Sequence, residues 1–108
     1  MQPVVRTSIL RCPPDKFDEM RQMMIETEKV LRPGIEVMRG LIAFYVGADE
    51  ATSSLSNISL WADLDAAKQL DRYQPMLDSG KPFVAAGGTF ERPIMNYTTL
   101  WQLQPVKS

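Results

Sequence analysis

The chain has 108 residues, of which 44% are hydrophobic, and its 12 basic and 13 acidic residues give a formal net charge of -1. This length and apolar content predict a single domain over residues 1–108 with one compact core. The balanced charge, with no run of basic residues, argues against nucleic acid as a partner.

Histidine is absent from the sequence, and Cys12 is the only cysteine. These two facts exclude Ser-His and Cys-His nucleophilic mechanisms, a histidine-ligated haem and the commonest zinc sites, so we expect no metal. The longest apolar stretch, Leu41–Val46, is far shorter than the roughly 20 residues that span a bilayer. The amino terminus lacks the pattern of a secretory signal. We therefore expect a cytoplasmic protein that does not associate with membranes.

The first predicted elements are a strand and a helix. Val4–Arg11 is rich in β-branched and apolar residues and has prolines on both sides, which is typical of a strand. From Asp15 onward, apolar residues recur at helical spacing, with acidic residues near the start and basic residues near the end. The sequence predicts that this helix stops before Pro33.

A hairpin is predicted next. Gly40 introduces the strand Leu41–Val46, the segment Gly47–Ala51 is expected to form the loop, and Ser54–Trp61 is expected to return as the third strand.

A second helix and a last strand complete the chain. Asp63 is a good N-cap for the helix, and Pro75 should break or restart it. A short turn is expected around Pro82 to Ala86. The segment Ile94–Leu103 favours extended structure and is expected to be a long fourth strand.

This β-α-β-β-α-β order predicts an α+β, ferredoxin-like fold, with a four-stranded antiparallel sheet and both helices on one face. The segments Val4-Val5, Ile9-Leu10 and Leu41–Val46 place apolar groups on both faces of the sheet. A bare apolar face of several hundred Å² is too large for a monomer. We therefore expect a homodimer formed by packing two sheet faces against each other.

The third strand offers one candidate site. A period of two places Asn57, Ser59 and Trp61 on one face. A buried amide beside an indole can hold a substrate oxygen or a developing oxyanion while the ring stacks on an aromatic ligand. The alternative is that Asn57 bonds a neighbouring backbone group and Trp61 closes the core, and the spacing alone is compatible with both.

The fourth strand offers a second set of candidates. Tyr97 and Trp101 share a face by the same parity, and together with Ser59 they would supply aromatic stacking and hydroxyl groups to an apolar or aromatic small molecule. The alternative is an extended strand that pairs across the dimer.

With Gly40 opening the second strand and Trp61-Ala62-Asp63 preceding an alanine-rich helix, the chain resembles the antibiotic biosynthesis monooxygenase-like proteins of the dimeric α-β barrel superfamily. The likeness covers Val4 to Leu103. In the oxygenating members an Asn and a Trp on one strand are linked to cofactor-free oxidation of phenolic polycyclic substrates, and Asn57 and Trp61 look like that pair. The resemblance implies deprotonation of a phenol, electron transfer to O2 and formation of a quinone, without metal or flavin.

Two other functions fit the sequence. One is a non-catalytic module that binds a small apolar ligand, because the chain has no histidine and no paired acid-base constellation. The other is a purely structural dimer with a filled core. A cavity beside Asn57 would separate the structural dimer from the other two.

Overall fold

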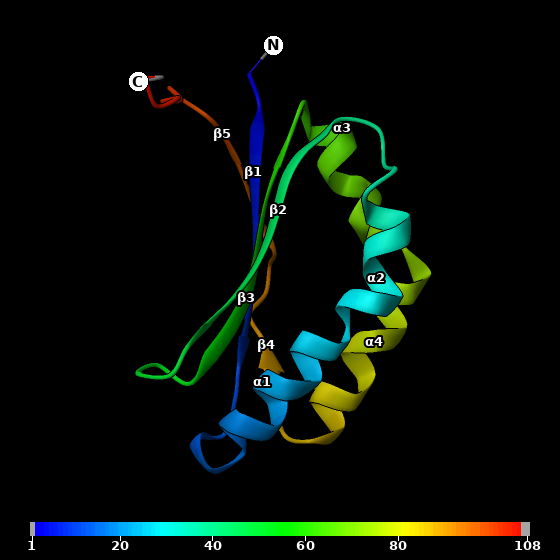
Figure 1. Cartoon of the computed structure of the whole chain (residues 1–108), viewed down its shortest axis with the longest axis vertical. Helices are drawn as coiled ribbons and strands as arrows, with labels where there is room; N and C mark the ends of the chain where they lie inside the picture. Colours follow the sequence, from blue (N-terminus) through cyan, green and yellow to red (C-terminus); the bar gives the residue numbers. More distant parts are fainter. Residues whose placement is uncertain (1, 107–108) are drawn as a thin grey trace.

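The structure, a computed structural model, describes residues 2–106 and consists of a sheet with its helices on one side (Figure 1). The strands are β1 (Val4–Arg11), β2 (Leu41–Asp49), β3 (Ser54–Trp61), β4 (Thr89–Phe90) and β5 (Met95–Thr98). The helices are η1 (Pro14–Lys16), α1 (Phe17–Glu26), α2 (Glu28–Ile35), α3 (Leu64–Ala67), η2 (Lys68–Arg72) and α4 (Gln74–Ala85). The predicted α+β, ferredoxin-like fold is confirmed.

The sheet is antiparallel, in the order β2-β3-β1, and both β4 and β5 pair with the remaining edge of β1. β4 lies beside Leu10 at the end of β1, and β5 lies beside Val4 at its beginning. The fourth position of the sheet is thus filled by two short strands. The predicted strand Ile94–Leu103 is wrong in its extent, since β5 covers only Met95–Thr98.

Backbone chemistry explains this difference. Pro93 has no N–H to donate to a ladder, so it separates the two short strands. At the other end, the amide and the hydroxyl of Thr99 both donate to the Pro3 carbonyl at 2.9 Å. β1 begins at the next residue, Val4, so the segment that follows Thr99 has no residue of β1 left to pair with.

The hairpin between β2 and β3 is tighter than the predicted loop Gly47–Ala51. β2 continues to Asp49, and Gly47 is paired with β3 inside the ladder. The chain reverses over residues 50–53, where the Ser53 N–H donates to the Glu50 carbonyl at 3.1 Å and Ser53 has a φ of 51°.

The first helical region continues past the point where the sequence predicts its end. It breaks at Thr27, whose hydroxyl donates to the Met24 carbonyl at 2.6 Å, and then α2 runs through Pro33 to Ile35. The prediction of a stop before Pro33 is wrong, although a proline inside a helix removes one intrahelical bond and crowds the preceding turn. The buried Ile35 anchors the last turn of α2 in the core.

The second helical region begins as predicted and ends later. The Asp63 carboxylate accepts from the Ala66 N–H at 2.8 Å and caps α3. Tyr73 is extended, and the helix restarts as α4 with Pro75 in its first turn. The predicted turn at Pro82 to Ala86 is wrong, because α4 continues through this segment. None of the helices within residues 2–106 is long and apolar enough to cross a membrane.

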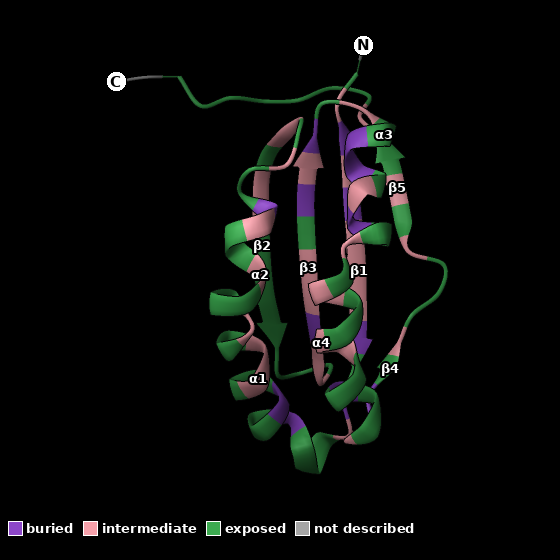
Figure 2. Cartoon of the chain, turned by 90° about the vertical axis from the view of Figure 1, so that its right-hand side faces the viewer, coloured by how far each residue is buried: buried purple, intermediate pink, exposed green. Residues whose placement is uncertain are grey.

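The core lies between the helices and the sheet, in one cluster around Trp61 and another around Met20 (Figure 2). No helix of residues 2–106 lies on the opposite face of the sheet (Figure 1). On that face Tyr45 pairs with Ile58 across the β2-β3 ladder, and Tyr97 lies on β5; all three are exposed. We call this the open face.

Candidate functional site

Asn57, Ser59 and Trp61 share the helix-facing surface of β3, as the period of two predicts. The alternation of side chains along β3 does not tell which face of the sheet this is, but the register between β3 and β1 does. Asn57 lies opposite Ser8, and Ser59 opposite Arg6, on the side of β1 that the helices cover. Asn57 therefore faces the helices and not the open face.

A cavity of about 570 Å³ lies between this surface and α4. Asn57 is half-buried in its wall, and no hydrogen bond of its amide occurs within residues 2–106. The apolar part of the lining comes from α1, α2, η2, α4, β4 and the linker after it: Met24, Leu31, Leu70, Met76, Leu77, Phe83, Val84, Phe90 and Ile94. An amide in an apolar cavity of this size is an arrangement that can orient one oxygen of an aromatic ligand.

The charged groups of the cavity come from β1, η2, α4 and the segment after β4. The Arg6 guanidinium is buried, and its Nη2 donates to Asp71 Oδ1 at 2.7 Å. Among the described residues Asp71 is the only carboxylate in the lining, and Lys81 and Arg92 add two further cations. The cavity thus carries more positive than negative charge.

Trp61 is fully buried and does not line the cavity. Its Nε1 donates to the hydroxyl of Ser59 at 2.8 Å, and Ser59 is also buried outside the lining. Trp61 packs in the core against Val4 and Leu70. Of the three predicted residues on this face, only Asn57 contacts the cavity.

Tyr97 and Trp101 are not brought to Asn57. Tyr97 points to the open face, opposite the helices, because it pairs with Val5 and not with a helix-facing residue of β1. Trp101 follows the end of β5 and is 81% exposed. The structure therefore separates the strand-four candidates from the cavity.

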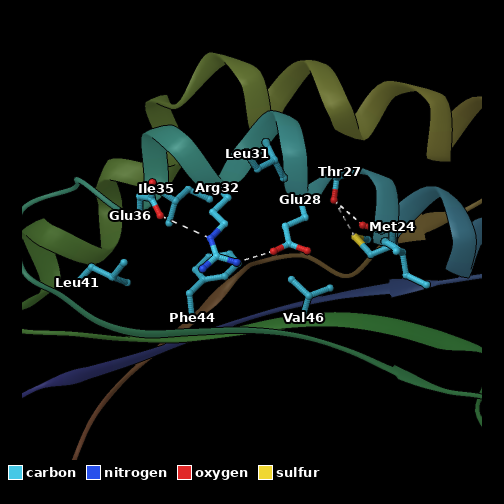
Figure 3. A pocket seen from close by; sticks show the side chains of 11 residues that line it. Met24, Thr27, Glu28, Leu31, Arg32, Ile35, Glu36, Leu41, Phe44 and Val46 are labelled. Atoms are coloured by element: carbon cyan, nitrogen blue, oxygen red, sulfur yellow. Dashed lines mark hydrogen bonds and ion pairs between the residues drawn. The ribbon is translucent and has the colours of Figure 1, made fainter.

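A second hollow of about 510 Å³ lies between α2 and β2 (Figure 3). Phe44 and Val46 of β2 form its floor, and Arg32 extends from α2 toward the sheet, where it pairs with Glu28. The residues that line both this hollow and the first cavity are Met24, Thr27 and Leu31. The two volumes are therefore neighbours, separated by these three side chains.

Arg6 and Asp71 were missed by the sequence reading. A signal for Arg6 existed, because a charged residue between Val4 and Leu10 at period-two positions falls on a face that is otherwise buried. No sequence signal linked it to Asp71, which is 65 positions away. Within residues 2–106 there is no group of three His, Cys, Asp or Glu side chains suited to a metal ion.

Solved structures with the same architecture are known. The cofactor-independent oxygenase SnoaB from Streptomyces nogalater aligns with a TM-score of 0.64 and 17% identity, covering 97% of this chain and 100% of that chain. A proposed antibiotic biosynthesis monooxygenase from Deinococcus radiodurans aligns with a TM-score of 0.72 and 12% identity, covering 96% and 99%. The chain has the fold of the antibiotic biosynthesis monooxygenases.

A conserved protein from Methanosarcina mazei has the same fold. It aligns with a TM-score of 0.67 and 15% identity, covering 91% of this chain and 93% of that one. No family model matches the sequence, and no curated protein matches it. The fold resemblance drawn from Gly40 and the turn at Trp61 is confirmed. At these identities the likeness establishes the fold, and the activity has to be argued from the cavity.

Proposed function

We propose that the protein is a cofactor-independent monooxygenase that oxidises a phenolic or quinol-type aromatic small molecule with O2. The observation that carries the proposal is the cavity of about 570 Å³, to which the inner strand β3 contributes the half-buried polar side chain of Asn57. The fold shared with the oxygenase SnoaB supports the same reaction class.

The chemistry requires no group beyond the substrate, O2 and side chains. The Asp71 carboxylate accepts the phenolic proton, and the Asn57 amide N–H donates to the anionic oxygen that results. The anion transfers electrons to O2. The ring carbon that is oxidised is a CH2 group in the keto tautomer of the substrate. One oxygen atom of O2 becomes the carbonyl oxygen at this carbon. The other oxygen atom leaves as water together with the two hydrogens of that carbon. The substrate supplies all the electrons, so the step balances without an external reductant.

Oxygen consumption by the purified protein against a panel of hydroquinones and polycyclic phenols tests this proposal. Asn57→Ala should lower the turnover rate about a hundredfold, the effect of losing one oxyanion donor. Asn96→Ala is the matched control, since Asn96 is also on the helix-facing side of the sheet but outside the cavity lining. Turnover that is equal in the two variants, or no turnover above buffer across the panel, would refute the proposal.

Trp61 enters this proposal as a positioning residue. Its indole holds the Ser59 hydroxyl and fills the core beside β3, which fixes the strand that carries Asn57. Trp61→Phe should therefore lower the rate much less than Asn57→Ala, and it should do so with a parallel loss of stability. A rate loss as large as that of Asn57→Ala in a stable variant would instead place the indole at the substrate.

We also propose that a second copy of the chain covers the open face, giving a homodimer through sheet faces. Tyr45, Ile58, Met95 and Tyr97 are exposed there on three strands. Contiguous apolar surface of this kind on a soluble domain is characteristic of an interface. The cavity lies on the other side of the sheet, so dimer formation leaves it accessible.

The second candidate function is a non-catalytic binding protein for an apolar or aromatic small molecule. It is favoured by the position of Trp61, which leaves Asn57 as the only member of the expected pair in the cavity. Binding of the same phenols without oxygen consumption would select this function. A structural dimer with a filled core is disfavoured by the cavity itself.

A further inference from the structure

Arg6 presents a buried hydrogen-bond donor that has no partner among the described residues. The residue is 3% exposed, in the middle of the central strand β1. Its Nη2 is satisfied by Asp71 Oδ1, whereas its Nη1 is buried and has no hydrogen-bond partner within residues 2–106. Buried donors are almost always paired in folded proteins, because an unpaired one keeps the full cost of its desolvation. An acceptor is therefore expected at Nη1.

A ligand in the cavity can supply that acceptor. Arg6 lines the cavity together with Asn57. Within residues 2–106 the other buried polar atom without a partner is Asn96 Oδ1; Asn96 pairs with Arg6 across the β1-β5 ladder but does not belong to the lining. Arg6 therefore contributes to the wall that a ligand in the cavity contacts, whereas Asn96 does not.

The charge of the cavity favours an anion. Arg6, Lys81 and Arg92 face one carboxylate, Asp71, and Asp71 is already paired with Arg6. The guanidinium has several N–H donors in one plane, so it can bind Asp71 on one nitrogen and a second oxygen on the other. The remaining wall is apolar and includes the rings of Phe83 and Phe90. The complementary ligand has an aromatic body and one anionic oxygen.

We propose that Arg6 Nη1 binds an acidic oxygen, a carboxylate or a phenolate, of the aromatic ligand in the cavity beside Asn57. The inference rests on the proposed function only for the location of the substrate, and it defines the substrate class as acidic aromatic compounds. The Arg6 guanidinium, on β1, binds the acidic oxygen of the ligand. The amide of Asn57, on β3, lines the same cavity.

Calorimetric titration with four two-ring probes tests the inference: 2-naphthoate against its neutral counterpart 2-naphthamide, and 2-naphthol against 2-methoxynaphthalene. The wild-type protein should bind the acidic member of at least one pair more than about tenfold tighter, the effect of a charge-assisted hydrogen bond in a buried site. The pair that shows the preference identifies the carboxylate or the phenolate as the oxygen. Naphthoate is not a phenol, so this binding can be present even if no oxygen is consumed.

Arg6→Gln should reduce that ratio to about one, and Arg6→Lys should keep part of it. The double variant Arg6→Gln/Asp71→Asn removes both charges and provides a neutral pair in case the single variant does not fold. Lys68→Gln is the control, because Lys68 is an exposed cation that does not line the cavity; its ratio should stay within about twofold of wild type. Equal affinity within both probe pairs, or a preference that survives the double variant, would overturn the assignment.

Discussion

Replacing Trp61 with Phe should lower the free energy of unfolding by ~2 kcal/mol. Trp61 is fully buried, and its Nε1 donates to the Ser59 hydroxyl at 2.8 Å. Removing part of the ring from a packed core costs ~1 kcal/mol. Leaving the buried hydroxyl without this bond costs about 1 kcal/mol more. In a domain of this size the sum corresponds to a fall in Tm of roughly 8 °C.

A double-mutant cycle measured by urea denaturation separates the two contributions. Ser59→Ala alone leaves the indole N–H unpaired and should cost about 1 kcal/mol, but in the W61F background it should cost much less, giving a coupling near 1 kcal/mol. Trp101→Phe is the matched control, because Trp101 is 81% exposed and its replacement should change stability by less than about 0.5 kcal/mol. Additive losses for Trp61 and Ser59, or a W61F variant as stable as wild type, would refute the reasoning.

Three further predictions concern stability and assembly. Gly34→Ala should lower stability in urea because the new Cβ would overlap the Tyr73 ring. The same change usually stabilises a helix by ~0.5–1 kcal/mol, so Tyr73→Ala should restore the usual sign. A Gly34→Ala variant more stable than wild type would contradict this packing. The bond from the helix N–H lowers the pKa of Asp63, so its stabilising contribution is present above the ordinary carboxyl pKa and is lost as the pH falls through the lowered value. Asp63→Ser, which caps without ionising, should therefore lose less stability on acidification, and an unchanged acid sensitivity speaks against this role. Ile58→Lys on the open face should give a monomer in sedimentation, with Val37→Lys as the exposed control; a persistent Ile58→Lys dimer excludes this interface.

The strands and the fold were predictable because the local patterns agree with the final packing. The extent of β5 was not, since it depends on where β1 begins, and Pro3 is distant in sequence from Thr99. The two helix ends at Pro33 and Pro82 were also misplaced. In both cases a buried residue close to the proline, Ile35 in α2 and Phe83 in α4, packs in the core and holds the turn that the proline weakens.

The candidate site was predictable only in part. Period two placed Asn57 and Trp61 on one face, but the face itself and the depth of each side chain depend on how α4 packs. Trp61 comes shortly before α3 in the sequence and is covered by that helix, whereas Asn57 lines the cavity. Arg6 lies on β1 between the apolar pairs Val4-Val5 and Ile9-Leu10, and its partner Asp71 is fixed only by the tertiary structure.

Among the described residues, those that line both hollows are Met24, Thr27 and Leu31 of the first helical region, and none of them lies on a strand. Shortening Leu31 should enlarge the space on both sides of it without any change in the backbone ladder. The length of ligand that fits is thus determined in the helical layer, whereas the groups that orient it, Arg6 and Asn57, are fixed in the sheet. Size selectivity and polar recognition can therefore evolve independently in this fold.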